Sequence, residues 1–260
     1  MNADKPPFPR LGEIYRVLAL ALDTKNKNRD IDSLARKGDY DWSLLPTLCR
    51  ELIAEPLERH TDADFAALVE QFVSYVHGSY IQLVATVSLD SLSREEVLPL
   101  LVENYFSAHA CGLLLDIQKE FGGPDLLVLL DAETNPLSVV LDWAGSANAD
   151  PNVNTLDKMV FPESTGADKT GREMLNRWRN GKQLPDIGNI KLFVKALKDK
   201  GFTQHDNLCR WLVVARALAW LEERSPVPLR HVMRQHVLLG LQDFDIGALL
   251  SHAAFHAGQK

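Results

Sequence analysis

The chain has 260 residues, of which 46% are hydrophobic and 24% charged. This composition is that of a globular protein with a sizeable core, and outside the Pro-rich stretch at 5–9 nothing in it indicates disorder. The length suffices for one large domain or two modest ones. The net charge of −7 argues against a protein that binds polyanions through its overall charge.

The cysteines and the N-terminus favour a cytoplasmic protein. Cys49, Cys111 and Cys209 lie far apart in the sequence, which argues against a disulfide framework and against a structural zinc site. Acidic Asp4 and several prolines precede the first apolar run, unlike a secretory signal. No uninterrupted apolar run approaches the length of a membrane span. We therefore expect no membrane as a partner.

Helical periodicity dominates the first part of the chain. Apolar residues recur at helical spacing over about residues 10–23, 44–57 and 62–87. The third stretch has the longest apolar stripe, with Thr61 or Asp62 as its N-cap, so we expect it to be central and Phe72 to be a core residue.

The middle of the chain carries helix-start and helix-stop signals. Ser93 and Glu96 have the spacing of a capping box, and Pro99 predicts a kink or a restart of the helix that follows. Residues 125–131 fit either a short buried helix or a buried strand. We favour a helix because no second strand pattern appears. The Asn135–Pro136 pair predicts a further helix, through Trp143.

The C-terminal part follows a polar stretch at 145–155, which is the best candidate for a linker. Beyond it, helical patterns cover about residues 204–223, 228–240 and 243–257. The predicted fold is all-α: a multi-helix bundle with an embedded helix-turn-helix-like segment. We expect an N-terminal helical domain over 1–145 and a C-terminal helical region over 156–260.

A local reversal of charge lies within this C-terminal region. Residues 168–200 contain nine bases and four acids, a net charge of +5, so the rest of the chain carries −12. The bases are Lys169, Arg172, Arg177, Arg179, Lys182, Lys191, Lys195, Lys198 and Lys200. This asymmetry is typical of a local site for an anionic partner.

The same segment resembles the second half of the helix-turn-helix of the phage-repressor (Cro-like) family, over about residues 171–197. Leu175 lies three residues before Trp178, Gly181 three after it, and Pro185 four after the glycine. A helix that ends in Ala-Leu follows. The first half departs from the family pattern, so residues 156–161 serve as the supporting helix only if the intervening turn is enlarged.

The resemblance implies that the helix carrying Trp178 lies in the major groove of DNA. It implies that Arg172, Glu173, Asn176 and Arg177 face the DNA, with Arg179 and Lys182 near phosphates. Arg179 stands where the family usually has an acid. The simpler alternative is a helical hairpin with Leu175 and Trp178 as core residues and a solvated basic face.

No catalytic, phosphate-loop or cofactor motif is recognisable. His252 and His256 lie four residues apart, but no acidic ligand accompanies them, so we predict no metal and no cofactor. The sequence thus favours a nucleic-acid-binding regulator of transcription, with duplex DNA and a protein partner or a second copy as its partners. Two alternatives stay open: a non-catalytic α-helical protein-interaction module, and a helical enzyme with a dispersed site.

Overall fold

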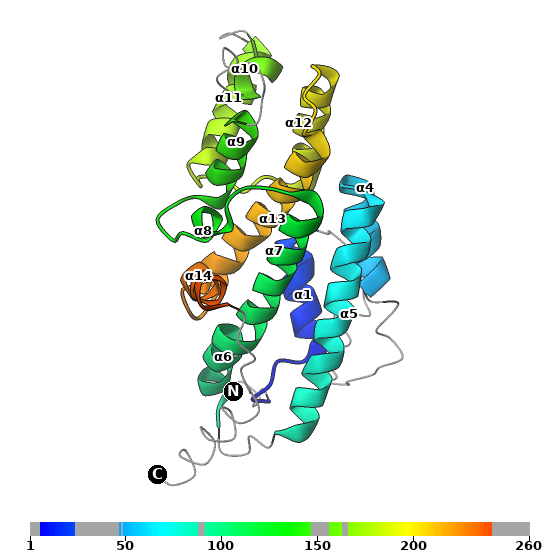
Figure 1. Ribbon diagram of the computed structural model, residues 1–260, viewed down its shortest axis with the longest axis vertical. Coiled ribbons are helices and arrows are strands. Elements are labelled where there is room, and N and C mark those ends of the chain that lie inside the picture. Colours follow the sequence, from blue (N-terminus) through cyan, green and yellow to red (C-terminus); the bar gives the residue numbers. More distant parts are fainter. Residues whose placement is uncertain are drawn as a thin grey trace.

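The structure is a computed structural model that describes residues 6–23, 47, 49–87, 92–146, 156–162 and 166–240. Within these ranges every regular element is a helix, which confirms the all-α prediction. Figure 1 shows an elongated bundle in which α9, α10, α11 and α12 lie at one end. The predicted helix over 243–257 lies outside the described residues.

The first helices follow the predicted periodicity. They are α1 (Leu11–Ala21), the π-helix η2 (Arg50–Ala54), α4 (Glu55–His60) and α5 (Ala63–Thr86). Of the two cap candidates, Asp62 is the one used: its side chain accepts a hydrogen bond of 3.0 Å from the Phe65 amide. Phe72 is only half-buried and packs against the core from its margin, whereas Phe65 on the same helix is fully buried.

A second helical run spans α6 (Arg94–Leu100), the π-helix η3 (Leu101–Phe106) and α7 (Ser107–Phe121). The predicted capping box is present, because the Glu96 carboxylate accepts from the Ser93 amide at 2.8 Å. Pro99 lacks an amide hydrogen for the regular helical bond. The chain stays helical after Pro99 but changes to the wider π-helical turn, so the expected interruption appears as a change of helix type.

The run Arg94–Phe121 is, among the described segments, the one long and apolar enough by length and composition to cross a membrane. Of its most apolar window, 33% is buried inside the protein. The π-helix η3 joins α6 and α7 into this one continuous run, where the sequence predicted a kink or a restart. Core helices of soluble proteins meet the same criterion, so the absence of a membrane partner stays a prediction.

The remaining helices lie close to their predicted positions. Residues 125–131 contain a short helix rather than a strand, and Asn135 caps the next helix by accepting from the Leu137 amide at 2.9 Å. These helices are α8 (Leu126–Leu129), α9 (Pro136–Ser146), α10 (Leu156–Val160), α11 (Gly166–Arg179), α12 (Ile187–Asp199), α13 (His205–Arg224) and α14 (Leu229–Leu239).

The hydrophobic core runs through both predicted regions. Its main cluster includes Tyr15, Phe65 and Leu141 from the N-terminal part, and Trp178 and Leu212 from the C-terminal part. The helices α9 and α12 both pack on α13, which therefore connects the bundle to the helix-turn-helix-like segment. A second, smaller cluster surrounds Tyr80 and Tyr105 at the other end of α5.

Candidate nucleic-acid interface

Helix α11 has an apolar inner face. Leu175 and Trp178 are 1% and 0% exposed, as their spacing predicted. The Trp178 ring meets the Phe193 ring of α12 edge-on, with centroids 6.0 Å apart. This contact fixes the rotation of α11 about its axis and therefore determines which residues face the solvent.

The C-terminal end of α11 is closed by a Schellman motif. Gly181 has a φ of 66°, the left-handed conformation that such an end requires. The Lys182 amide donates to the Arg177 carbonyl at 2.9 Å, and the Gly181 amide donates to that of Trp178 at 3.1 Å. The Asn135 side chain adds a bond to the Trp178 carbonyl at 3.1 Å, which joins α11 to the start of α9.

The turn between α11 and α12 is anchored by distant residues. Asp186 caps α12 by accepting from the Asn189 amide at 2.8 Å. The Ile187 amide donates to Asp23 at 3.0 Å, just beyond α1, and the buried Arg216 donates to the Pro185 carbonyl at 2.7 Å. Arg216 also donates to carbonyls at the end of α1, so three helices meet at this turn.

The short helix α10 lies where the resemblance required a supporting helix. Arg172 of α11 donates to the carbonyls of Phe161 and Pro162 at 2.7 and 2.8 Å, directly after α10. At Gly171 the Phe161 ring comes so close that an added Cβ would lie 2.3 Å from it. A helix-turn-helix-like pair is therefore held together here, although residues 163–165 of its turn lie outside the described residues.

The outer face of α11 carries three of the six predicted contact residues. Glu173, Asn176 and Arg177 are exposed on this helix, and Lys182 is exposed directly after it. Arg172 is half-buried, because its guanidinium is bound to the backbone after α10. Arg179 lies apart from these residues: its side chain is 20% exposed and sits 3.9 Å from Asp157.

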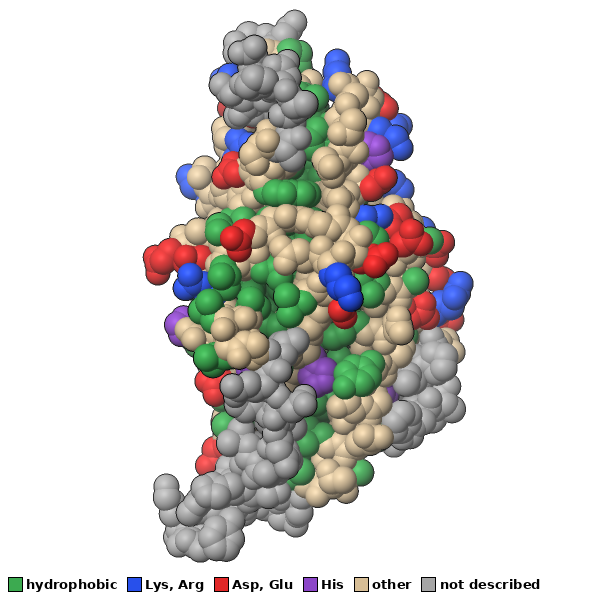
Figure 2. Space-filling model, viewed as in Figure 1, with side chains coloured by type: hydrophobic (Ala, Val, Ile, Leu, Met, Phe, Trp, Pro, Cys, Tyr) green, Lys and Arg blue, Asp and Glu red, His purple; other side chains and the backbone are tan. Residues whose placement is uncertain are grey.

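Three further lysines of the basic segment lie on α12, while Lys169 lies on α11 and Lys200 directly follows α12. Lys195 and Lys198 are exposed, and Lys191 donates to the Arg59 carbonyl at the end of α4. In Figure 2, Lys and Arg side chains appear along both edges of the upper part of the molecule. The positive charge is thus spread over two helices, and α11 is the one that resembles a recognition helix.

Another cluster of reactive side chain types lies deep in the bundle. The Tyr15 hydroxyl is 2.9 Å from Cys49 Sγ and 2.8 Å from His77 Nδ1. Burial raises the pKa of Tyr15 and of Cys49, and it lowers the pKa of His77 to about 4. All three groups are therefore neutral near pH 7, so the cluster has the character of a structural network rather than of an activated nucleophile.

No group of three or more His, Cys, Asp or Glu side chains is placed to hold a metal ion, as far as the described residues go. His252 and His256 lie outside them. Comparisons of the chain with models of known families, with curated proteins and with solved structures find no match.

Proposed function

We propose that the chain is a nucleic-acid-binding regulatory protein and that α11 contacts duplex DNA. The observation that carries the proposal is the division of α11 into two faces. Leu175 and Trp178 anchor the inner face, while Glu173, Asn176 and Arg177 project from the outer face. A recognition helix needs this combination of a fixed rotation and a polar exposed surface.

The supporting contacts agree with such a role. In helix-turn-helix proteins the first helix crosses the DNA backbone while the second enters the major groove. Here α10 precedes α11, and Arg172 of α11 donates to the two carbonyls that directly follow α10. The Schellman motif keeps Lys182 next to the end of α11, where its ammonium group reaches a phosphate.

The exposed side chains suit base recognition in the major groove. Asn176 offers the paired donor and acceptor that match adenine, and Arg177 offers two donors that match guanine. Glu173 accepts from the amino group of cytosine and repels phosphates, so it favours sequence recognition over indiscriminate binding. The acidic remainder of the chain weakens binding to DNA in general, which makes these local contacts decisive.

The test is a titration of fluorescently labelled duplex DNA with the full chain, followed by anisotropy at several salt concentrations. A double variant, Arg177→Ala with Lys182→Ala, is compared with the parent. Loss of the Lys182 phosphate contact should make the negative slope of log K against log salt shallower by about one unit, and loss of the Arg177 base contact should weaken binding further. The matched control is Arg50→Ala with Lys119→Ala, which removes two exposed positive charges outside the basic segment.

We expect the control to bind like the parent and the Arg177–Lys182 variant to bind more weakly with a flatter salt dependence. The proposal is wrong if the parent does not bind duplex DNA at low salt, or if the two double variants weaken binding equally. In the first case the helical interaction module becomes the better interpretation. An assay of self-association by analytical ultracentrifugation then tests that alternative directly.

A further inference from the structure

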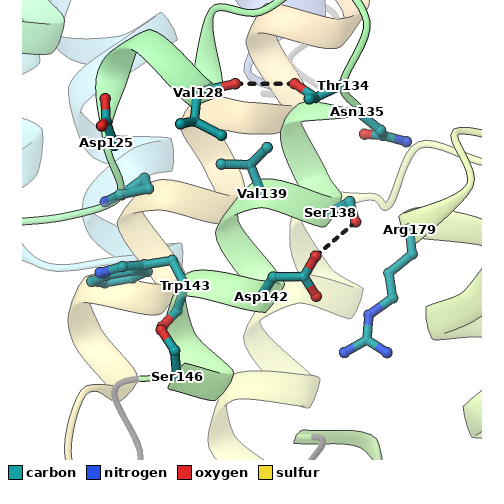
Figure 3. Close-up of a pocket in the computed structure, with 11 residues that line it drawn as sticks. Asp125, Val128, Thr134, Asn135, Ser138, Val139, Asp142, Trp143, Ser146 and Arg179 are labelled. Carbon is teal, nitrogen blue, oxygen red and sulfur yellow. Dashed lines mark hydrogen bonds between the residues drawn. The ribbon is translucent and has the colours of Figure 1, made fainter.

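An open groove of about 610 Å³ runs along the outer face of α9, between α8 and the end of α11 (Figure 3). Its floor is apolar and includes Val128, Val139 and Trp143. Charged side chains stand at its margins: Asp142 on α9 and Arg179 on α11. A mixed surface of this kind suits a small ligand with an apolar body and charged ends.

The guanidinium of Arg179 is poorly satisfied by the protein. Its only contact among the described residues is the 3.9 Å ion pair with Asp157, which is too long for a hydrogen bond. Its Nε is buried without a hydrogen-bond partner there. By contrast, Arg172 and Arg216 each donate bonds of 2.7 Å to backbone carbonyls. The terminal nitrogens of Arg179, which lines the groove, therefore retain donors for a carboxylate.

The opposite charge stands on α9. Asp142 is exposed and accepts one hydrogen bond, of 3.2 Å, from Ser138. Figure 3 shows Arg179 extending from α11 toward the Asp142 side of the groove. Asp125, which caps α8, adds a second carboxylate to the lining. The two carboxylates repel a simple anion and also a nucleic-acid phosphate, and they attract a ligand with a positive charge, while Arg179 provides a partner for a negative group on the same ligand.

We infer that this groove binds a free α-amino acid with an apolar side chain. The carboxylate of the ligand pairs with Arg179 and its ammonium group with Asp142. Its side chain lies on Val139 and Trp143. This site is separate from the exposed face of α11 that carries the proposed DNA contacts.

The test is isothermal titration of the full chain with L-leucine, L-methionine and L-phenylalanine. Each is compared with its N-acetyl derivative, which lacks the ammonium charge, and with its amide, which lacks the carboxylate. We expect at least one free amino acid to bind and both of its derivatives to bind at least tenfold more weakly. A tenfold loss corresponds to about 1.4 kcal/mol, in the range of one charge-assisted hydrogen bond.

Two variants and one control locate the site. Asp142→Asn and Arg179→Gln should each weaken binding at least tenfold, whereas Glu133→Gln, on the exposed loop before α9, should leave it unchanged. Since Asp142 is exposed, its variant folds even if that of Arg179 does not. The inference is overturned if no free amino acid binds, if the derivatives bind equally well, or if Asp142→Asn keeps the parent affinity. None of these results affects the DNA titration, which depends on Arg177 and Lys182.

Discussion

Trp178 is the residue on which the orientation of α11 depends. Its side chain is fully buried, and its indole N–H has no hydrogen-bond partner among the described residues. The ring therefore acts through packing, chiefly against Phe193 and the surrounding core. An aromatic ring without a polar partner tolerates replacement by a smaller aromatic ring better than removal.

Trp178→Ala should lower the free energy of unfolding by about 3–5 kcal/mol, the usual range for emptying a buried aromatic site. Trp178→Phe should lower it by less, because a ring is retained and no hydrogen bond is lost. The adjacent Arg177→Ala is the control and should stay within about 0.5 kcal/mol of the parent. Urea denaturation followed by circular dichroism measures all three. Equal stability of the parent and Trp178→Ala would show that the ring is not a packing anchor.

His77 gives the fold a sensitivity to acid. Burial lowers its pKa from 6.5 to about 4, so the unfolded chain takes up a proton in this window that the folded chain excludes. The stability due to neutral His77 is complete above pH 6.5 and is lost as the pH falls toward 4. Burial shifts the pKa of His60 and of His109 in the same direction, so they add to the slope.

His77→Gln should therefore flatten the decline of unfolding free energy between pH 6.5 and 4 without abolishing it. The amide retains the ability to bond with Tyr15 but does not titrate. His231→Gln, at an exposed position of α14, is the matched control and should keep the parent slope. Urea denaturation at several pH values gives the answer, and a His77→Gln profile parallel to that of the parent would contradict the argument.

At the scale of the elements, α11 and α12 end in the same way but in different surroundings. Both have a Schellman motif with a glycine of positive φ, 66° at Gly181 and 87° at Gly201. A Cβ at Gly201 would meet nothing within 4 Å, whereas at Gly181 it would lie 2.9 Å from Nδ2 of Asn135. Gly201 is thus required only for its positive φ. Gly181 is required for its positive φ and also because a Cβ there would collide with the Asn135 side chain.

Gly201→Ala should lower the unfolding free energy by about 1–2 kcal/mol, the strain of a left-handed non-glycine residue. Gly181→Ala should lower it further, by about 1 kcal/mol, because the bond from Asn135 to the Trp178 carbonyl must break or lengthen. Thermal and urea unfolding of the two variants compare them directly. If both lose the same stability, Asn135 moves aside freely and does not join α11 to α9.

The elements that the sequence predicted well are those with local signals. The capping box at Ser93, the cap at Asn135 and the period of α5 depend on residues a few positions apart, so they could be read directly. The prediction that Phe72 is a core residue was wrong, because helical periodicity shows which face of α5 is buried but not which residue of that face is buried most deeply.

The candidate site was predictable only in part. The spacing of Leu175 and Trp178 gave the buried face of α11 correctly. The binding of Arg172 to the backbone after α10 has no local signal, since it depends on how the enlarged turn folds back. The same holds for the groove, in which Arg179 approaches α9 across more than thirty residues of sequence. Contacts of this kind depend on the tertiary fold and not on the pattern of residues.

At the scale of the whole molecule, the predicted regions 1–145 and 156–260 share one hydrophobic core. The main cluster takes residues from both, and α9 and α1 pack on α13. A fragment of residues 1–145 would expose the faces of these helices that α13 covers in the full chain. We therefore do not expect the two predicted regions to be independent folding units.

We expect fragment 1–145 to unfold without a cooperative transition, because it lacks the partner surfaces of α13 and α14. Urea titrations of the fragment and of the full chain, followed by circular dichroism at 222 nm, compare them. A steep sigmoidal transition in the fragment would establish an autonomous N-terminal domain.

The contacts of Asp23 and Arg216 also determine how late in translation α1 can be covered. Arg216 reaches the carbonyl of Leu20 across 196 positions, and the Ile187 amide reaches Asp23 across 164. At about 5–20 residues per second, α1 is synthesised roughly ten to forty seconds before Arg216. During that interval the apolar side of α1 has no α13 to cover it. Within this interval α1 is open to chaperones that bind nascent chains, because its contacts with Arg216 form only after α13 has been translated.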